Sequence, residues 1–369
     1  MINSNFKNTI LEKTFKNKVV IITGHTGFKG SWLSIWLLML GAKVVGISKD
    51  IPTKISHFET LKLSQELDDN RINIKDFDSL VKIIKDHQPD FIFHLAAQPL
   101  VRKSYEEPIE TWSSNLIGTV NILESLKKIE KSCSVVMITS DKCYRNKEWI
   151  WGYRENDELG GPDPYSASKG AAELAIRSYF ESYYKSSNIN LASVRAGNVI
   201  GGGDWAEDRI VPDCIRSWTM NEKVSIRNPK STRPWQHVLE PLSGYLNIAT
   251  KLEDNSDFSG ESFNFGPSSD NNFSVEDLIK EMAKNWEAVK WEVIDKEISS
   301  HESSLLKLNC DKSLDLLGWH PTLNFQSTVK FTVDWYKEYN KNSKMLEISQ
   351  NQIIDYCDIA KKLNLKWMR

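Results

Sequence analysis

The chain has 369 residues, and its 47 basic residues against 49 acidic ones give a formal net charge of −2 at pH 7. This balance supplies no global basic field, which argues against nucleic acid or a membrane surface as a partner. No apolar run reaches membrane-spanning length and the N-terminal residues lack a signal-peptide core, so we expect a cytoplasmic protein. The cysteines are scattered without a Cys-x-x-Cys pair, which predicts free thiols, no metal site and no disulfide framework: Cys133, Cys143, Cys214, Cys310 and Cys357.

Residues 18–23 form a short, β-branched apolar run that is typical of a strand buried on both faces. A turn follows with glycines at its first, fourth and seventh positions, Gly24, Gly27 and Gly30, and residues 31–40 then indicate a buried helix. Such glycines let the backbone turn tightly and approach a pyrophosphate, while the helix N-terminus offers unpaired N–H groups. This order of features predicts a dinucleotide-binding unit.

A second strand is predicted at residues 43–48, and Asp50 follows it. An acidic side chain about 20 residues after the last glycine is placed to bond the adenine ribose hydroxyls. Because a carboxylate there would repel a 2′-phosphate, the residue favours NAD over NADP, although the neighbouring Lys49 weakens that argument.

Strands and helices continue to alternate along the first half of the chain. Further buried strands are predicted at residues 91–95, 134–139 and 191–195, with helices at 108–128 and 165–184 between them. Repeated βα units with short connections indicate an α/β fold with a doubly wound parallel Rossmann sheet. Right-handed crossovers in such a sheet place ligands at the carboxyl ends of the strands.

Tyr165 and Lys169 lie four residues apart in the second of these helices, so both side chains project from the same helix face. A phenol is a poor base at neutral pH because its ordinary pKa is about 10. An ammonium beside it favours the phenolate and makes a base suited to removing a hydroxyl proton during hydride transfer. A Tyr and a Lys at this spacing are common on surface helices. The dinucleotide-binding glycine loop earlier in the chain favours a catalytic role for this pair.

The regular alternation stops after the glycines at 201–203, which suggests that a smaller, mixed α/β substrate-binding domain begins there. The run at 263–266 and an amphipathic helix at 275–286 would belong to it. The expected division is 1–197 with 232–252 for the NAD-binding Rossmann domain, and 198–231 with 253–369 for the smaller domain. The amphipathic C-terminal stretch 353–369 is expected to pack on the smaller domain or on a partner subunit.

Six strings resemble the extended short-chain dehydrogenase/reductase family, also described as NAD-dependent epimerases and dehydratases. They are Thr23–Leu33, His94–Arg102, Ser140–Tyr144, Trp151–Arg154, Arg195–Trp205 and Arg233–Val238. Within the family they look most like the 4,6-dehydratases that act on CDP-glucose, over about residues 15 to 340. The resemblance implies a lyase with a tightly held NAD, a homodimer, and a CDP-hexose substrate converted to a 4-keto-6-deoxy sugar for deoxysugar and lipopolysaccharide synthesis.

The resemblance also implies catalytic roles. Tyr165, supported by Lys169, would remove the sugar C4 hydroxyl proton, and Ser140 would share the hydrogen bond to that hydroxyl. Asp141 stands where the family places the acid that protonates the departing C6 hydroxyl. Lys142 replaces the Glu that serves as C5 base in related dTDP-glucose enzymes. It acts as a base only if its pKa is depressed; alternatively it stabilises the enolate as a cation.

Binding residues follow from the same resemblance. For NAD they are Gly24, Thr26, Gly27, Phe28, Lys29, Gly30, Asp50, Asn73, Ile74, Leu95, Ala96, Ala97, Tyr165 and Lys169, with Asn73 standing where many members have Asp. For the substrate they are Gln98, Arg102, Asn198, Trp205, Arg209, Arg233 and His237. Arg233 suits the diphosphate because a guanidinium matches two phosphate oxygens. Trp205 is the tryptophan expected near the sugar nucleotide, whereas His237 is read more readily as a packing histidine.

Three alternatives stay open. A 4-epimerase of the same superfamily needs the glycine loop and the Tyr-Lys pair but has no need for Asp141 and Lys142. A dehydratase for GDP-mannose or another CDP-hexose stays possible, because base recognition is expected in the second domain, where the sequence is least informative. A non-catalytic dinucleotide sensor would have no need for Tyr165 or Lys169.

Overall fold

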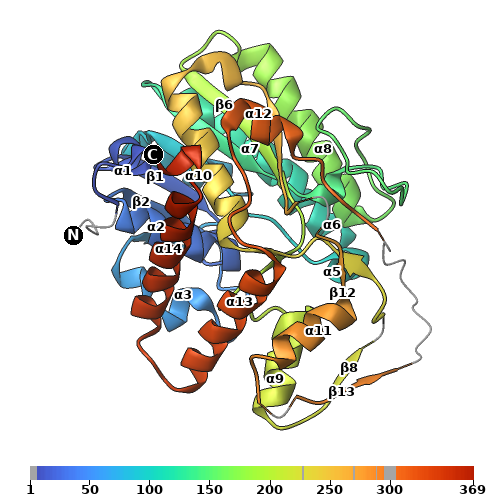
Figure 1. The fold of residues 1–369 in the computed structure, drawn as a ribbon. Coiled ribbons are helices and arrows are strands. Elements are labelled where there is room, and N and C mark those ends of the chain that lie inside the picture. The colour runs from blue at the N-terminus through green and yellow to red at the C-terminus, as the bar shows by residue number, and fades with distance from the viewer. Residues whose placement is uncertain (1–5, 227, 269–270, 288, 295–304) are drawn as a thin grey trace.

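The computed structural model describes the chain except for residues 1–5, 227, 269–270, 288 and 295–304 (Figure 1). At its centre lies a seven-stranded sheet in the order β11-β6-β5-β4-β1-β2-β3, with every neighbouring pair parallel. Its strands are β1 (Val19–Thr23), β2 (Lys43–Ile47), β3 (Asp68–Asn70), β4 (Phe91–His94), β5 (Cys133–Ile138), β6 (Ile189–Ala196) and β11 (Ser262–Phe265). The strand order reverses between β1 and β4, and such a switch point is where ligands bind in this type of sheet.

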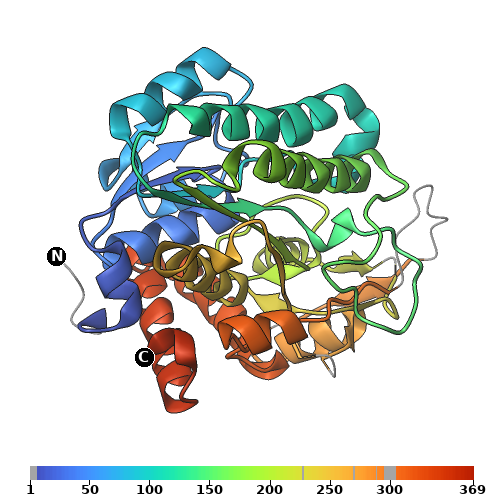
Figure 2. The same cartoon turned by 90° about the horizontal axis from the view of Figure 1, so that it is seen from above.

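Helices cover both faces of the sheet (Figure 2). One face carries α2 (Phe28–Met39), α10 (Leu239–Asp254) and α14 (Met345–Lys362), and the other carries α4 (Phe77–His87), α7 (Gly118–Ser125) and α8 (Pro164–Tyr179). Because side chains alternate along a strand, Val20 and Ile22 of β1 join one apolar core and Ile21 joins the other. The doubly wound Rossmann fold expected from the sequence is confirmed.

The helices expected on the second face are present, and each contains a π-helical segment. Residues 108–128 are helical throughout but pass through a π-helical turn, in the segments α6 (Pro108–Trp112), η3 (Ser113–Ile117), α7 and η4 (Leu126–Lys128). The α8 helix begins at a strong signal, because Asp163 Oδ1 accepts a hydrogen bond from Ser166 N at 2.9 Å and Pro164 occupies the first turn. This cap places Tyr165 at the start of the helix, close to the carboxyl end of the sheet.

A smaller group of elements lies below the sheet in Figure 1. Its helices are α9 (Ile210–Thr219) and α11 (Val275–Ala283), and its strands pair two by two: β8 (Val224–Ile226) with β13 (Trp291–Val293), and β9 (Thr232–Arg233) with β12 (Phe273–Ser274). A further pair, β7 (Val199–Ile200) and β10 (Gln236–His237), connects this group to the main sheet. The helix expected at 275–286 is therefore present, ending at Ala283.

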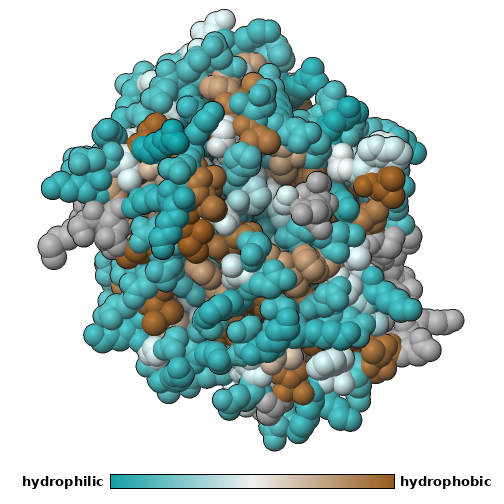
Figure 3. All heavy atoms as spheres, in the orientation of Figure 1, coloured by the Kyte–Doolittle hydropathy of each residue, from teal (hydrophilic) through white to brown (hydrophobic). Residues whose placement is uncertain are grey.

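The remaining elements connect these layers. The helices are α1 (Ile10–Phe15), α3 (His57–Thr60), α5 (Val101–Glu106), α12 (Asp311–Leu317) and α13 (Phe325–Asn340). The short turns are η2 (Leu63–Gln65), η5 (Asp141–Cys143), η6 (Phe180–Tyr184), η7 (Ser256–Phe258) and η8 (Lys366–Met368). On the face shown in Figure 3 hydrophilic side chains predominate and apolar ones are exposed in small groups.

Two placements differ from the expectation for the C-terminal part. The run at 263–266 contains β11, which pairs in parallel with β6 and forms the edge of the main sheet, so its assignment to the smaller domain is wrong. The C-terminal helix packs on the Rossmann helix α2, where the Trp36 ring lies 5.8 Å from Tyr356 and 6.2 Å from Trp367. Large aromatic rings on both helices bury each other there, which gives this contact its stability.

Candidate active site

The glycine loop lies tightly against the end of β4. Gly24 has a φ of +77°, and a Cβ atom there would stand 2.8 Å from the Ala96 backbone nitrogen. A Cβ on Gly30 would stand 2.1 Å from the Gly24 carbonyl oxygen. Only glycine fits at these two positions. The loop leads into α2, whose N-cap is Gly27 and whose first N–H groups donate no hydrogen bond to a capping side chain. This cradle therefore fits the pyrophosphate of a dinucleotide.

The side chains of the loop mostly serve its own structure. Thr26 Oγ1 donates to the Asp50 carbonyl at 2.7 Å, which ties the loop to the end of β2. His25 is fully buried and its Nε2 lies 2.9 Å from Asp69 Oδ1. The imidazole therefore fills the loop and does not face a substrate. The Asp50 carboxylate is exposed and lies 3.7 Å from the Lys49 ammonium, where it is free to meet ribose hydroxyls.

The other residues expected at the cofactor fall into two groups. Leu95, Ala96 and Ala97 directly follow β4 and are half-buried beside the loop. Asn73 Oδ1 accepts a hydrogen bond from Lys75 N at 3.0 Å, so its side chain stabilises a turn. Ile74 is buried against Gly118, since a Cβ atom added to Gly118 would stand 2.4 Å from Ile74 Cδ1.

Tyr165 and Lys169 are both buried, one helical turn apart on α8. Burial raises the pKa of the Tyr165 phenol to about 12, and a hydrogen bond with the Ser140 side chain opposes this rise. Burial lowers the pKa of the Lys169 ammonium to about 8, against the charge of Glu173. Both groups are thus buried away from water, where a nearby charge strongly shifts their pKa values.

The segment after β5 brings an acid to the same place. Ser140 caps the short turn η5, and its Oγ donates to Asp141 Oδ1 at 3.0 Å and accepts from Lys142 N at 3.2 Å. Burial raises the pKa of Asp141, and the charges of Lys142 and Lys29 act against that rise. Asp141 also acts on the titration of Tyr165, so the acid and the phenol share one electrostatic environment.

Two cations from other elements complete this environment. Lys29, in the first turn of α2, interacts with Asp141 and has its pKa lowered to about 8 by burial. Its ammonium lies 6.0 Å from the ring centre of Tyr245 on α10. Arg209 forms an ion pair with the buried Asp204 at 2.7 Å, and its charge acts on Tyr165. The sequence-predicted residues Tyr165, Asp141 and Arg209 therefore do come together.

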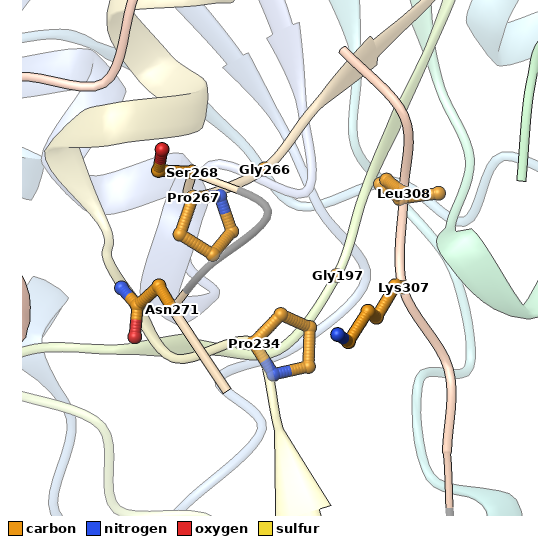
Figure 4. A pocket seen from close by; sticks show the side chains of 8 residues that line it. All are labelled: Gly197, Pro234, Gly266, Pro267, Ser268, Asn271, Lys307 and Leu308. Atoms are coloured by element: carbon orange, nitrogen blue, oxygen red, sulfur yellow. The ribbon is translucent and has the colours of Figure 1, made fainter. Parts of the chain in front are cut away.

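A small pocket opens beside this group (Figure 4). It is lined by Gly197, Pro234, Gly266, Pro267, Ser268, Asn271, Lys307 and Leu308. The pocket borders the acid, because a Cβ on Gly197 would stand 3.1 Å from Asp141 Oδ2. Asn198 follows Gly197 and is half-buried, and Arg233 precedes Pro234, with its Nη1 donating to the Thr232 carbonyl at 2.8 Å. Lys307 points into the pocket from a segment that the sequence did not single out.

Four expected substrate contacts lie elsewhere or are occupied. The His237 ring has no exposure and packs 6.2 Å from Trp32, as a packing histidine does. Trp205 lies 5.0 Å from the Tyr339 ring on α13, where it holds that helix.

The Gln98 amide bonds the Leu100 backbone and Thr111 Oγ1, which uses both ends of the side chain. Arg102 is exposed, and its Nη1 lies 2.9 Å from Asp208 Oδ1. This pair joins α5 to the loop before α9.

Glu173 is a buried carboxylate that sequence reasoning missed. It lies one turn beyond Lys169 on α8 and forms an ion pair with Arg195 Nη2 at 2.8 Å. Its spacing from Lys169 was visible in the sequence, but a Glu in a helix carries no signal of burial. Within the described part of the chain, no three His, Cys, Asp or Glu side chains gather as metal ligands. In that same part, no helix combines the length and apolar character needed to span a membrane.

Comparison with known proteins defines the family. A family model described as GDP-mannose 4,6 dehydratase matches residues 21–332. The chain belongs to the GDP-mannose 4,6-dehydratase family. This confirms the resemblance to the extended short-chain dehydrogenase/reductases that the motifs indicated.

The proteins that this chain is similar to differ in the reactions that their names give. The chain is 48% identical to CDP-glucose 4,6-dehydratase of Salmonella typhimurium over 94% of this chain and 98% of that protein. It is 23% identical to CDP-paratose 2-epimerase of Salmonella typhi over 86% of this chain and 98% of that protein. Among solved structures, dTDP-glucose 4,6-dehydratase of Bacillus anthracis in complex with NAD matches with a TM-score of 0.73 and 21% identity, covering 89% of this chain and 99% of that one. UDP-glucose 4-epimerase of Thermotoga maritima matches with a TM-score of 0.74 and 21% identity, covering 87% of this chain and 99% of that one.

Proposed function

We propose that this protein is a hydro-lyase that converts CDP-D-glucose to CDP-4-dehydro-6-deoxy-D-glucose with NAD as its cofactor. The observation that carries the proposal is the 48% identity to CDP-glucose 4,6-dehydratase over nearly the full length of both chains. The buried Asp141 beside Tyr165 supports it, because an epimerase needs no acid for water loss. We assign the reaction to the cytoplasm, in the synthesis of deoxysugars for polysaccharides such as lipopolysaccharide.

The cofactor would lie on the cradle formed by the glycine loop and the start of α2, with the exposed Asp50 at the adenine ribose. NAD held there would supply a hydride acceptor for the sugar C4 and a hydride donor for C6, and the positive charge of its nicotinamide would favour the Tyr165 phenolate. Tyr165 removes the C4 hydroxyl proton while Ser140 holds the hydroxyl in place. Lys169 supplies the positive charge that keeps the phenolate accessible.

The resulting 4-ketone acidifies the C5 proton, and elimination then removes that proton together with the C6 hydroxyl. Asp141 protonates the departing hydroxyl, a role that suits a carboxyl whose pKa is raised by burial. Lys142, half-buried at the next position, either takes the C5 proton or stabilises the enolate as a cation. Water leaves, and the net reaction is dehydration without net oxidation.

The substrate diphosphate would lie between the sheet and the smaller group of elements. Arg233 on β9 directly precedes Pro234 of the pocket, and Asn198 directly follows Gly197 of the pocket. Arg209 lies near Tyr165 and acts on its charge. A guanidinium offers two parallel donors to phosphate oxygens. We retain the division into a Rossmann domain and a smaller substrate domain as part of this proposal, with β11 and α14 moved to the Rossmann side.

We further propose a homodimer formed through α5, α6, η3, α8 and η6. Large apolar side chains are exposed on these elements in the monomer: Tyr105 at 51%, Ile109 at 82%, Ile117 at 50%, Leu174 at 61% and Tyr183 at 55%. Exposed large apolar side chains on neighbouring elements are typical of an interaction site. A symmetric dimer would bury the same patch on both subunits.

A turnover assay on a panel of nucleotide sugars tests the function. The purified protein is incubated with NAD and, separately, with CDP-glucose, dTDP-glucose, GDP-mannose and UDP-glucose, and each product is analysed by mass. We expect loss of one water from CDP-glucose with the highest kcat/KM. A product of unchanged mass would identify a 4-epimerase, and preferential dehydration of another nucleotide sugar would overturn the assignment of CDP-glucose.

A further inference from the structure

Glu173 continues the catalytic face of α8. Tyr165, Lys169 and Glu173 follow one another at intervals of four residues, so their side chains lie on one face of the helix. All three are buried, and Glu173 is only 3% exposed. A fully buried carboxylate is costly unless it is paired and hydrogen-bonded, so its place beneath the Tyr-Lys pair requires an explanation.

The Glu173 carboxylate is held from three directions. Its Oε2 accepts hydrogen bonds from Arg195 Nη2 and from Ser193 Oγ, both at 2.8 Å, and its Oε1 accepts one from Thr139 Oγ1. Burial alone would raise the pKa of Glu173, but Arg195 and these hydrogen bonds outweigh it and hold the pKa below its usual value. The carboxylate is therefore an anion at neutral pH. Thr139 also directly precedes Ser140 and begins the segment that carries Asp141.

The groups that act on Lys169 come from four elements. They are Lys29 on α2, His94 on β4, Cys143 on η5 and Glu173 on α8 itself. Burial lowers the pKa of His94 to about 3 and raises that of Cys143 well above its usual value, so both are neutral. Lys29 is a like charge. Of these four groups, Glu173 is the one that favours the protonated ammonium.

We propose that Glu173 is a positioning residue that keeps Lys169 protonated at neutral pH and, through Thr139, fixes the segment that carries Ser140 and Asp141. This inference rests on the proposed function, in which Lys169 supplies charge to Tyr165. Arg195 has a separate part, since its Nη1 donates to Tyr144 Oη at 2.7 Å and to the Glu155 carbonyl at 2.9 Å. The guanidinium thus links the Glu173 carboxylate to the loop that follows η5.

The direction of the effect follows from the charges. Burial pulls the pKa of Lys169 down, and the Glu173 anion holds it up. Replacing Glu173 with neutral glutamine removes the opposing charge, so the Lys169 ammonium should lose its proton at lower pH. Hydride transfer, which needs that ammonium, should then reach its alkaline limit at lower pH as well. Loss of a residue with only a structural role would change the rate or the melting temperature. It would change neither the pH at which Lys169 loses its proton nor the alkaline limit of hydride transfer.

The test is a pH titration of protein labelled with carbon-13 lysine, read by NMR on the cofactor-free protein. The Lys169 signal is assigned by its absence in Lys169→Met. In Glu173→Gln we expect its midpoint to fall by about one pH unit, and the alkaline limit of reduced-nicotinamide formation in single turnover to fall with it. Glu240→Gln is the matched control, because it removes another fully buried carboxylate, at 1% exposure, outside this group and should leave both midpoints in place.

If Glu173→Gln fails to fold because Arg195 is left unpaired, Glu173→Gln/Arg195→Gln replaces it and the same fall is expected. An unchanged Lys169 midpoint in whichever of these variants folds would overturn the inference. Failure of the wild type to form reduced nicotinamide from CDP-glucose would instead overturn the proposed function. In that case the NMR midpoint still decides the role of Glu173, because it is measured without substrate.

Discussion

Asp141 lies directly against the backbone of Gly197, so that a Cβ atom at position 197 would stand 3.1 Å from Asp141 Oδ2. This separation is tighter than ordinary van der Waals contact. The strand end of β6 therefore forms one wall for the acid that follows β5, and that wall is formed by a residue without a side chain. Strands β5 and β6 together restrict the position of the Asp141 carboxyl group more than the turn η5 would do alone.

Gly197→Ala should displace Asp141 and slow water loss by at least about tenfold, because small misplacements of a reacting group cost large factors in rate. C4 oxidation should continue, so reduced nicotinamide should accumulate in a single-turnover absorbance trace. Normal turnover in Gly197→Ala would show that this wall does not position the acid.

Lys142→Ala should stall the reaction after oxidation and before water loss, whichever of its two roles is correct. We expect the reduced-nicotinamide absorbance to rise and stay, and exchange of the C5 proton with deuterated water to fall. Lys142→Glu separates the roles, because a glutamate restores a base but not a cation. Rescue favours proton abstraction, and failure in a folded protein favours enolate stabilisation. Wild-type turnover in Lys142→Ala would exclude both.

The purified protein should release NAD when it is denatured, and Asp50→Asn should improve the use of NADP. The exposed Asp50 carboxylate would repel a 2′-phosphate, and removing its charge should lower the KM for NADP by about tenfold. Steady-state kinetics with both cofactors measure the change. Asp86→Asn, an exposed acid on α4, is the control and should change neither KM. A wild type that uses NADP as readily as NAD would contradict the role of Asp50.

Leu174→Lys should convert the proposed dimer to a monomer. Leu174 is 61% exposed on α8 in the single chain, and a lysine in an apolar symmetric interface would bury two charges. Light scattering after size exclusion measures the mass. Leu314→Lys alters an apolar residue on α12 that is 40% exposed and should remain dimeric. A wild type that elutes as a monomer would refute the assembly itself.

Glu240 should make stability depend on pH. Its carboxylate accepts hydrogen bonds from Thr322 N and Leu323 N, and burial raises its pKa to about 7. This folded-state pKa lies above the unfolded value of 4.5. The contribution of Glu240 to the free energy of unfolding is therefore complete below pH 4.5 and is lost as the pH rises through 7. The loss is on the order of 3 kcal/mol.

Denaturant unfolding of wild type and Glu240→Gln from pH 5 to pH 8 measures this contribution. The stability of the wild type relative to the variant should fall across that range. A constant difference between the two proteins would mean that the carboxylate keeps an ordinary pKa when folded.

Much of the Rossmann part was predictable because its signals are local. The apolar runs of β1, β4 and β5 and the cap of α8 each lie within a few residues of one another, and so do Tyr165 and Lys169. The roles of these residues remain predictions that the experiments above test.

What the sequence did not indicate depends on partners far apart in the chain. Strand β11 has four residues and is recognisable as a sheet strand only through β6. The two motifs that contain Trp205 and His237 do not indicate which way the rings point. In the structure the Trp205 ring points towards α13 and the His237 ring towards α2. The pairing of Glu173 with Arg195 and the contact of Gly197 with Asp141 are likewise fixed by the neighbouring strands and not by spacing.

The place of β11 at the edge of the main sheet has a practical consequence. The chain leaves the sheet after β6, builds part of the smaller group, returns through α10 and β11, and leaves again before α11. No single cut separates a nucleotide-binding fragment from a sugar-binding fragment. A truncation near residue 200 would remove an edge strand and a covering helix from the sheet and expose apolar surface. Specificity in this protein should therefore be exchanged by grafting individual loops, since whole segments cannot be transplanted as modules.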